Sequence, residues 1–593
     1  MKDFLKTALA TLTGIAAFSI ISLFLFISLI GAFASIGEVR PTVPSSAILT
    51  IDMSKIVLSE QTQETDVLTL VQGGDTEINT IGIHDVIKSI NTAALDPSVS
   101  LIFMKPDAAM GGSALIEELR SALENFRKSG KAVVSYIECP SNTGMYLASV
   151  SDKIYMTPFD GGINKFGGAS AQMVFLKDLL DNLGIKVQLI RHGKYKSAGE
   201  IFINSAPSKE NLLQNKAIVE SIWGCWSHTI ADSRGLDVAR LNAMLNNLEL
   251  VSPQDFADNG LVDALMTREE LINKLASFSG QGNAANANYI SLNDYITAYA
   301  ATDTKLTNAK VAVIYLHGEI VDGNGFEQVA GDRYAKMIAD IRKDSSVKAA
   351  VLRVNSPGGS VLAAEKILAE IKLLQASMPV VASFGDMAAS GGYWVSAGCN
   401  KIYSNSTTLT GSIGVFSMVP DFSKTLDDKL HVNIVSVNSN PHADMYGLMR
   451  PLTNAEAQYM QKSVEKIYDR FTGLVAEGRN MKRDYVDEIA QGRVWTGEDA
   501  LAIGLVDEIG TIEDAISWAV NSVSLYVDED DISLEAYPKP LSKWEMLLTQ
   551  FSRSEPNILA GTPFKSVGDA FSSWTKAQAG KVYARVPYEF VIQ

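Results

Sequence analysis

The sequence contains few residues of the kinds that form disulfides or bind metal ions. It has three cysteines and six histidines among 593 residues. Cys139, Cys225 and Cys399 are odd in number and lie far apart, which fits neither a disulfide framework nor a zinc pattern. The histidines show no ligand spacing either. We therefore expect no metal, and we interpret the cysteines as small packed side chains.

The sequence also lacks an excess of positive charge. Its net charge is −16, and no stripe of Lys and Arg is present that could neutralise phosphates, which argues against a nucleic-acid partner. The 47% of apolar residues is enough to form large cores. A chain of this length suggests at least two domains.

Charge is absent altogether between Lys6 and Glu38, where apolar residues dominate. A helix that spans a bilayer needs about 20 apolar residues, whereas the apolar region of a cleaved signal peptide has only about 7–15. We predict an uncleaved transmembrane anchor within residues 1–36, although "AFAS" near Phe33 loosely resembles a cleavage site. Lys2 and Lys6 precede the run, so the N-terminus should be cytoplasmic and the body outside.

The rest of the chain contains an internal duplication. The triplet "GGS" at Gly111 recurs at Gly358, 247 positions (358 − 111) further along, and "GLVD" at Gly260 recurs at Gly504, 244 positions (504 − 260) further along. A nearly constant offset over such a length is hard to obtain by chance, and repeats of this size decide the fold. We predict a duplicated domain.

Each copy has the same order of elements. An apolar strand (100–105 or 349–355) leads into the Gly-Gly-Ser turn, a helix with apolar residues at helical spacing and a second apolar strand. Such units imply parallel strands buried between helices, so the fold class is α/β. We place the domains at the boundaries 45–279 and 308–540, with a linker at 280–307 and a C-terminal extension at 541–593.

One hydroxyl of the second copy has the surroundings of a nucleophile. Ser390 lies in "MAASGGYW", where small residues allow another chain to come close. A serine hydroxyl needs an adjacent base, and no His, Asp or Glu follows nearby. The first copy has Thr143 at the matching position.

The first copy supplies a base that the second copy lacks. Lys196 lies in "YKSA", and the second copy has no lysine between Lys429 and Lys462. A buried lysine can be neutral, because burial lowers its pKa by several units, and Ser–Lys is a known variant of the serine hydrolase arrangement. We therefore predict one composite site, with Lys194 and His192 as alternatives to Lys196.

A Gly-Gly turn could complete this site. "NSPGGS" (355–360) joins a strand to a helix. The amides of Gly359 and of Gly391, which follows the serine, could hold a developing oxyanion, each worth roughly 3 kcal/mol at the transition state. This mechanism requires no cofactor.

Several motifs together resemble signal peptide peptidase A (protease IV) in its long, duplicated form. They are "NSPGGS", "MAASGGYW", "TLTGSIG" (408–414), "GRVWTGEDALAIGLVD" (492–507) and "YKSA". The resemblance implies a ClpP/crotonase-type fold in each half and a membrane-anchored serine endopeptidase. By matching motif positions it assigns Ser390 as nucleophile and Lys196 as general base. It also implies signal peptides as substrates, a homotetramer, and a catalytic body on the periplasmic side of a bacterial inner membrane.

Two other classes of function are compatible with parts of the pattern. A crotonase-like enzyme acting on a CoA thioester would share the fold and the glycine turn but would not need the Ser–Lys pair. A non-catalytic scaffold built from peptidase-like domains would leave Ser390 unreactive towards an acylating probe. The sequence assigns no role to residues 59–85 or 551–593.

Overall fold

We describe the chain from a computed structural model. It describes residues 41–62, 78–299, 309–326, 328–524, 531–539 and 582–585, together with scattered positions between 6 and 22. The predicted anchor at 1–36 therefore lies mostly outside the described residues. Among those that are described, we find no helix with both the length and the apolar character needed to cross a bilayer.

The first half of the chain is built on a six-stranded sheet in which neighbouring strands run parallel. The spatial order of its strands is β8 (Ala264–Leu265), β6 (Lys153–Met156), β5 (Ala132–Ile137), β4 (Val99–Lys105), β1 (Ala47–Asp52) and β9 (Tyr289–Ser291). Consecutive residues of β1, β4 and β5 are buried on both faces. The apolar strands of the sequence are therefore covered on both sides, as parallel sheets require.

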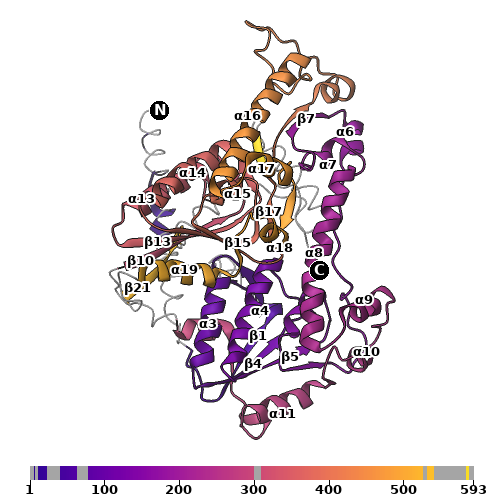
Figure 1. Ribbon diagram of the computed structural model, residues 1–593, viewed down its shortest axis with the longest axis vertical. Coiled ribbons are helices and arrows are strands. Elements are labelled where there is room, and N and C mark those ends of the chain that lie inside the picture. Colours follow the sequence, from indigo (N-terminus) through magenta and orange to yellow (C-terminus); the bar gives the residue numbers. More distant parts are fainter. Residues whose placement is uncertain are drawn as a thin grey trace.

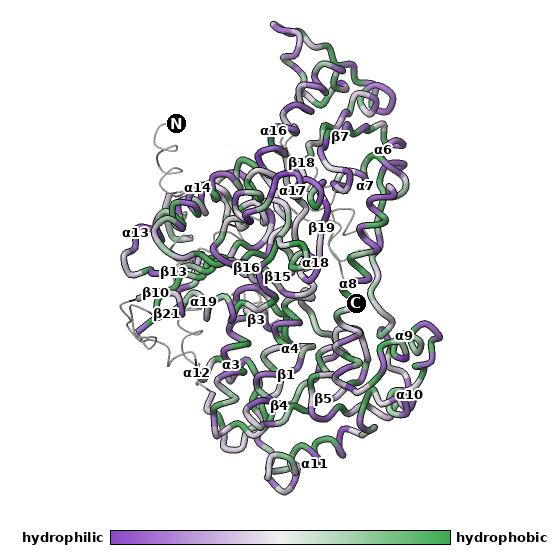
Figure 2. Tube along the Cα trace, viewed as in Figure 1, coloured by the Kyte–Doolittle hydropathy of each residue, from purple (hydrophilic) through white to green (hydrophobic). Residues whose placement is uncertain are grey.

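Helices cover this first sheet because each presents one apolar side. In Figure 2, the tubes of α3 (Ile83–Leu95) and α4 (Ser113–Lys128) alternate between hydrophobic and hydrophilic residues. The remaining helices of this half are α5 (Asn142–Ala148), α6 (Lys177–Leu183), α7 (Glu200–Ile203), α8 (Lys209–Arg234), α9 (Val238–Asn246), α10 (Pro253–Asp258), α11 (Arg268–Phe278) and α12 (Leu292–Tyr299).

The second half repeats this plan around its own sheet. The main path runs β19 (Val494–Thr496), β17 (Leu409–Gly411), β15 (Val380–Ala389), β13 (Val347–Ser356), β10 (Ala309–His317) and β21 (Ile532–Tyr537), with β16 (Lys401–Ser404) on β15 and β20 (Glu508–Ile509) on β16. Its helices are α13 (Gly331–Lys343), α14 (Val361–Gln375), α15 (Gly391–Ser396), α16 (Asn454–Gly478), α17 (Arg483–Ile489), α18 (Gly497–Ala502) and α19 (Ile512–Ser524). The α/β class predicted from the repeat is confirmed.

A third sheet joins the two halves. Its order is β12 (Val329–Ala330), β11 (Ile320–Val321), β14 (Gly358–Ser360), β22 (Val582–Arg585), β18 (Val415–Asp421) and β7 (Lys186–His192). Figure 1 shows α6, α7 and β7 of the first half beside α16 of the second, at the far end of the long helix α8. The sequence repeat did not predict this exchange of a strand between halves.

Buried charges also connect the halves. Arg353 on β13 is fully buried and donates to the carboxylates of Glu60 (2.6 Å) and Glu118 (2.7 Å), both from the first half. Burial alone would lower the pKa of Arg353, but the two carboxylates raise it, so this guanidinium stays charged. Taking one member away would leave an uncompensated charge in the interior.

A second link uses the glycine turn of the first half. The carboxylate of Asp386, on β15, accepts a hydrogen bond from the Ala114 amide (2.9 Å) in the first turn of α4. A side chain on Gly112 would place its Cβ 2.0 Å from the Asp386 carboxyl carbon, so this approach requires glycine. The turn at Gly112, which is equivalent to Gly358–Ser360 in the second copy, therefore binds the Asp386 side chain of the other half.

Part of the predicted linker belongs to the first half. Within 280–307, β9 pairs with β1 and α12 packs on α3 and β1. Apolar residues such as Ile290 and Tyr295 are buried there, which the small, polar residues before them had not indicated. The domain boundaries themselves stay a prediction.

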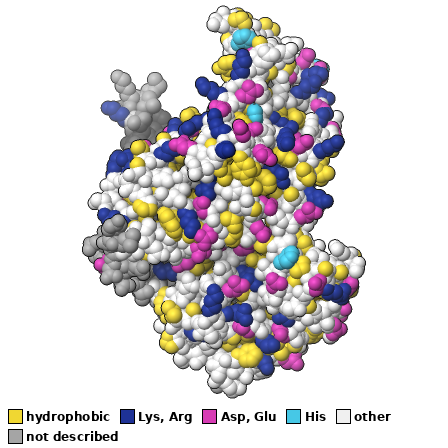
Figure 3. Space-filling model, in the orientation of Figure 1, with side chains coloured by type: hydrophobic (Ala, Val, Ile, Leu, Met, Phe, Trp, Pro, Cys, Tyr) yellow, Lys and Arg dark blue, Asp and Glu magenta, His cyan; other side chains and the backbone are white. Residues whose placement is uncertain are grey.

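On the face drawn in Figure 3, positive and negative side chains are interspersed.

Candidate active site

Ser390 occupies a sharp turn from strand to helix. It follows β15 and precedes α15, with φ 55° and ψ −111°, a region that non-glycine residues rarely adopt. Two backbone hydrogen bonds hold it there: its amide donates to Gly411 O (2.8 Å), and its carbonyl accepts from the Trp394 amide (2.7 Å). A strained turn of this kind presents a side chain at the end of a sheet.

Lys196 reaches Ser390 because β7 of the first half adds to β18 of the second. The two strands are antiparallel, with Val415 opposite His192 and Asp421 opposite Lys186. Lys196 follows β7 by four residues, and Ser412 precedes β18 by three. The pairing therefore brings the lysine loop to the segment that follows β17.

The amine and the hydroxyl lie within hydrogen-bonding distance. Lys196 Nζ is 2.8 Å from Ser390 Oγ, 2.9 Å from Ser412 Oγ and 3.1 Å from the Ser412 carbonyl. All three residues are at most 1% exposed. Burial lowers the pKa of Lys196 well below its ordinary value, so the geometry and the surroundings both suit a neutral amine.

Close packing excludes water from the methylene chain of Lys196. A Cβ on Gly492 would lie 2.6 Å from Lys196 Cβ, and Gly492 has φ +76°, so glycine is required on both counts. A Cβ on Gly414 would lie 3.2 Å from Lys196 Cδ. Glycine backbones therefore form the close wall around the methylene chain of Lys196.

An ion pair between Arg191 and Glu200 fixes the loop that carries Lys196. Arg191 Nη1 donates to the Lys196 carbonyl (2.8 Å) and to Glu200 Oε1 (2.9 Å). Glu200 is fully buried and also accepts from Ser208 and Asn211 at the start of α8. The loop is thus tied at both ends to elements of the first half.

The predicted oxyanion donors lie in adjacent elements. Gly391 begins α15, where the first amides of a helix have no partner within it. Gly359 lies in β14, where a Cβ would approach the Ile320 carbonyl to 1.9 Å. A Cβ on Gly392 would come within 2.9 Å of Ser356 O, so the serine turn lies close against the end of β13. Their role as donors stays a prediction.

The two alternatives to Lys196 lie elsewhere. Lys194 is exposed, and its amine lies over the ring of Tyr195 at 5.3 Å. His192 stacks on Tyr468 with ring centroids 3.8 Å apart. The structure thus brings Lys196 to Ser390 and directs the other two side chains to different neighbours.

Sequence reasoning did not identify Ser412 as part of the site. The residue was within the quoted motif "TLTGSIG", but nothing in its spacing linked it to a lysine more than two hundred positions away. Its φ of 49° is unusual for serine and is visible only in three dimensions. The available signal in the sequence was a hydroxyl residue, Ser412, among small and apolar neighbours, a pattern that is typical of a buried hydroxyl.

A strand from the C-terminal extension lies beside the site. β22 is antiparallel both to β14, with Ala584 opposite Gly359, and to β18, with Tyr583 opposite Phe416. The extension had no assigned role in the sequence, and no pattern in it predicts this pairing.

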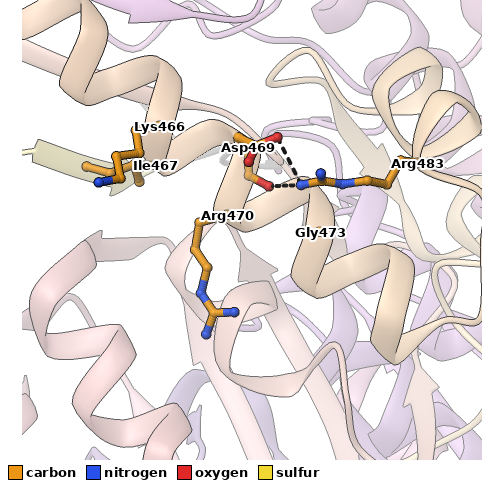
Figure 4. A pocket seen from close by; sticks show the side chains of 6 residues that line it. All are labelled: Lys466, Ile467, Asp469, Arg470, Gly473 and Arg483. Atoms are coloured by element: carbon orange, nitrogen blue, oxygen red, sulfur yellow. Dashed lines mark hydrogen bonds and ion pairs between the residues drawn. The ribbon is translucent and has the colours of Figure 1, made fainter.

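A surface depression elsewhere has different chemistry. Figure 4 shows it on α16 and α17, lined by Lys466, Ile467, Asp469, Arg470, Gly473 and Arg483. Its two arginines are paired: Arg483 contacts Asp469 at 3.0 Å and Arg470 contacts Glu365 at 2.9 Å. Within the described part of the chain, no group of three or more His, Cys, Asp or Glu side chains has the arrangement of a metal site.

The Ser390–Lys196 arrangement can perform one kind of chemistry directly. A neutral amine at this distance can accept the proton of a hydroxyl that attacks an electrophilic carbon. The strained turn presents the hydroxyl, and the nearby helix start offers backbone amides to a developing negative charge.

Comparison with known proteins identifies the family. The profile of Peptidase family S49 matches residues 125–281 and 372–525, which are equivalent parts of the two copies. Protease 4 of Haemophilus influenzae is 34% identical over 77% of this chain and 75% of its own length. Protease 4 of Salmonella typhi is 34% identical over 84% of this chain and 82% of its own.

A solved structure is also matched, that of a ClpP1 mutant from Listeria monocytogenes. It is 17% identical with a TM-score of 0.24, and the match covers 34% of this chain and 94% of that one. The match to the S49 profile covers more than half of the sequence, and it occurs twice. The chain therefore belongs to peptidase family S49 and is a serine peptidase with a duplicated family domain.

Proposed function

We propose that the chain is an endopeptidase in which Ser390 is the nucleophile and Lys196 the general base. The observation that carries this proposal is the 2.8 Å contact between Lys196 Nζ and Ser390 Oγ in a buried place. The low pKa of the amine supports it, because a protonated lysine could not accept the serine proton.

In the proposed reaction, Ser390 Oγ attacks a peptide carbonyl carbon while Lys196 takes the hydroxyl proton. The amides of Gly359 and Gly391 hold the oxyanion. The carbon–nitrogen bond then breaks, and Lys196 gives the proton to the leaving amine. Water, deprotonated by the same lysine, hydrolyses the acyl ester and restores Ser390.

We infer that substrates bind as extended peptides beside the glycine turn. β22 pairs with β14 and β18 at this place, so the strand position accepts a peptide backbone, and strand addition supplies affinity through main-chain hydrogen bonds. We propose apolar peptides, including cleaved signal peptides, as the substrate class. A strong preference for charged residues at the scissile bond would contradict it.

We also propose that residues 1–36 anchor the enzyme with its catalytic body on the outer face of the cytoplasmic membrane, and that the chain forms a homotetramer. The apolar run between Lys6 and Glu38 supports the anchor. Protection of the body from protease in right-side-out vesicles would contradict the orientation. A monomeric mass of the detergent-solubilised protein would contradict the tetramer.

The decisive experiment is mass spectrometry of the enzyme after reaction with a serine-acylating probe. We expect a single adduct on Ser390, with no labelling of Ser390→Ala. Lys196→Ala should react at least about a hundredfold more slowly at neutral pH, because the hydroxyl loses its base, while Lys194→Ala should react normally. An adduct on another serine would refute the assignment.

A further inference from the structure

The strand position beside the dyad is occupied by this chain itself. β22 lies between β14 and β18 in the third sheet, and its backbone pairs with both neighbours. Without β22, β14 and β18 would face each other across one empty strand position. The occupant comes from a segment more than 160 residues beyond β18 in sequence.

The register shows which way this segment runs. Tyr583 lies opposite both Ser360 and Phe416, and Arg585 lies opposite Gly358. Ser412, which contacts the Lys196 amine, precedes Phe416 by four residues. Because β18 and β22 are antiparallel, the chain advances towards the level of Ser412 as it goes from Tyr583 to Arg585. At about 3.3 Å per residue, Arg585 comes within about 7 Å of that level along the strand.

We infer that this strand position is a peptide-binding site whose resident ligand is the chain's own segment Val582–Arg585, which competes with peptide substrates. The inference deepens the proposed function and rests on it for the identity of the substrate position. One strand position holds one backbone, so a substrate pairs with β14 and β18 only after β22 leaves. The competition is intramolecular, because the occupant is covalently part of the enzyme.

Tethering makes such a competitor effective even when its intrinsic affinity is low. A linked segment acts at an effective concentration of about a millimolar. If the free segment binds with a dissociation constant of about 0.1 mM, the tethered form weakens the binding of an added peptide about tenfold.

A proline substitution in β22 tests this competition directly, since proline removes a backbone donor and is not tolerated in a strand with neighbours on both sides.

The first experiment measures peptide binding to the full-length Ser390→Ala chain by fluorescence anisotropy. The probe is a fluorescein-labelled peptide with the sequence of residues 581–586, KVYARV. We expect Ala584→Pro in the chain to tighten binding of this peptide about tenfold. Val582→Pro should act in the same direction, and Ala579→Pro, placed before the paired residues, should have no effect.

Equal affinity in the Ala584→Pro, Val582→Pro and unaltered chains would overturn the inference. Hydrogen exchange gives a second readout in the chain without added peptide. Phe416 and Ser417 are consecutive in β18, so their amides point to opposite edges, one towards β22 and the other towards β7. The amide that faces β22 should exchange faster in Ala584→Pro than in Ala579→Pro, and equal rates would count against occupancy.

The second experiment measures hydrolysis of a short apolar peptide by the active chain. We expect Ala584→Pro to lower KM about tenfold, by a factor that does not change between dilute and concentrated enzyme. A factor that grows with enzyme concentration would mean that the segment of a neighbouring copy is the competitor, which would refute the intramolecular form.

The two experiments separate the inference from the proposed function. The binding experiment uses Ser390→Ala and does not depend on which residue is the nucleophile. Turnover that survives in Ser390→Ala would end the proposed mechanism while the binding result still decides the occupancy of the strand position. Loss of turnover in Ser390→Ala together with unchanged peptide affinity in Ala584→Pro would refute the inference alone.

Discussion

Lys196 and Ser412 share two contacts. The amine nitrogen is 2.9 Å from the Ser412 hydroxyl and 3.1 Å from the Ser412 carbonyl oxygen. Together with Ser390 Oγ, these oxygens surround the nitrogen on several sides. The direction of the lysine lone pair therefore depends on Ser412, a residue that the sequence did not link to the site.

Replacing Ser412 should impair turnover more than substrate binding. Ser412→Ala and Ser412→Gly remove the hydroxyl and keep the carbonyl contact, and Gly also tolerates the φ of 49°. The lost hydrogen bond is worth about 1 kcal/mol, so we expect kcat to fall roughly fivefold in both variants, with little change in KM. Steady-state kinetics test this, and a wild-type kcat in both variants would exclude an orienting role.

The pH dependence of turnover should report the buried amine. Burial lowers the pKa of Lys196, and only the neutral amine accepts a proton. The rate kcat/KM should thus be high at alkaline pH and fall as pH decreases through the lowered pKa. Measuring the same profile in His192→Ala should give the same acid limb. A limb that disappears in that variant would instead assign the ionisation to the histidine.

The cost of burying Lys196 should appear in stability. The folded state holds the amine neutral, whereas the unfolded chain takes up a proton below its ordinary pKa near 10.4. The wild type therefore loses stability relative to Lys196→Met as pH falls below about 10, by up to about 1.4 kcal/mol per pH unit until the folded pKa is reached. Denaturant unfolding of the wild type and of Lys196→Met at several pH values measures this difference, and a difference that does not change with pH would contradict a lowered pKa of the buried amine.

Glu117 predicts the opposite pH trend. Burial raises its pKa to about 7, despite hydrogen bonds from Thr407 and Trp226. The unfolded chain loses this proton near pH 4.5, so folding is penalised increasingly from there to pH 7 and fully above it. Glu117→Gln should raise stability by about 3 kcal/mol at pH 8 and leave it unchanged at pH 4. An equal effect at both pH values would contradict the assigned cause.

The buried contacts of Arg353 should be essential for joining the halves. Arg353→Ala leaves Glu60 and Glu118 without their cation, which costs about 3–5 kcal/mol. Arg470→Ala breaks an exposed pair with Glu365 and should cost less than about 1 kcal/mol. Chemical denaturation compares the two variants. A small loss in Arg353→Ala would show that the carboxylates find other partners.

The sequence was sufficient to predict features that each copy carries within itself. The α/β class and the duplication followed from apolar strands and a constant offset. The sheets and helices of the structure confirm the class, and the two family matches confirm the duplication. Ser390 and Lys196 were found by comparing the copies, because each copy lacks what the other keeps. Their catalytic roles remain predictions.

Contacts made between the copies could not be predicted in the same way. The addition of β7 to β18, the approach of Ser412 to Lys196 and the pairing of Arg353 with Glu60 depend on how two separate cores are oriented. Local periodicity describes one element and its own sheet, and it contains no register for strands that meet across a domain interface. Gly414 and Gly492, which pack on Lys196, lie in two of the quoted motifs, but nothing in their spacing links them to the lysine.

The position of Asp386 against the start of α4 has an evolutionary consequence. In the present chain, the turn at Gly112 is closed by an acid from the later copy, with no room for even a methyl group. Restoring a lysine and a serine to the missing positions would therefore not regenerate a second centre. The separation of roles between the two copies is therefore hard to reverse. A second site would require loss of the contact between Asp386 and the start of α4, which helps to hold the two halves together.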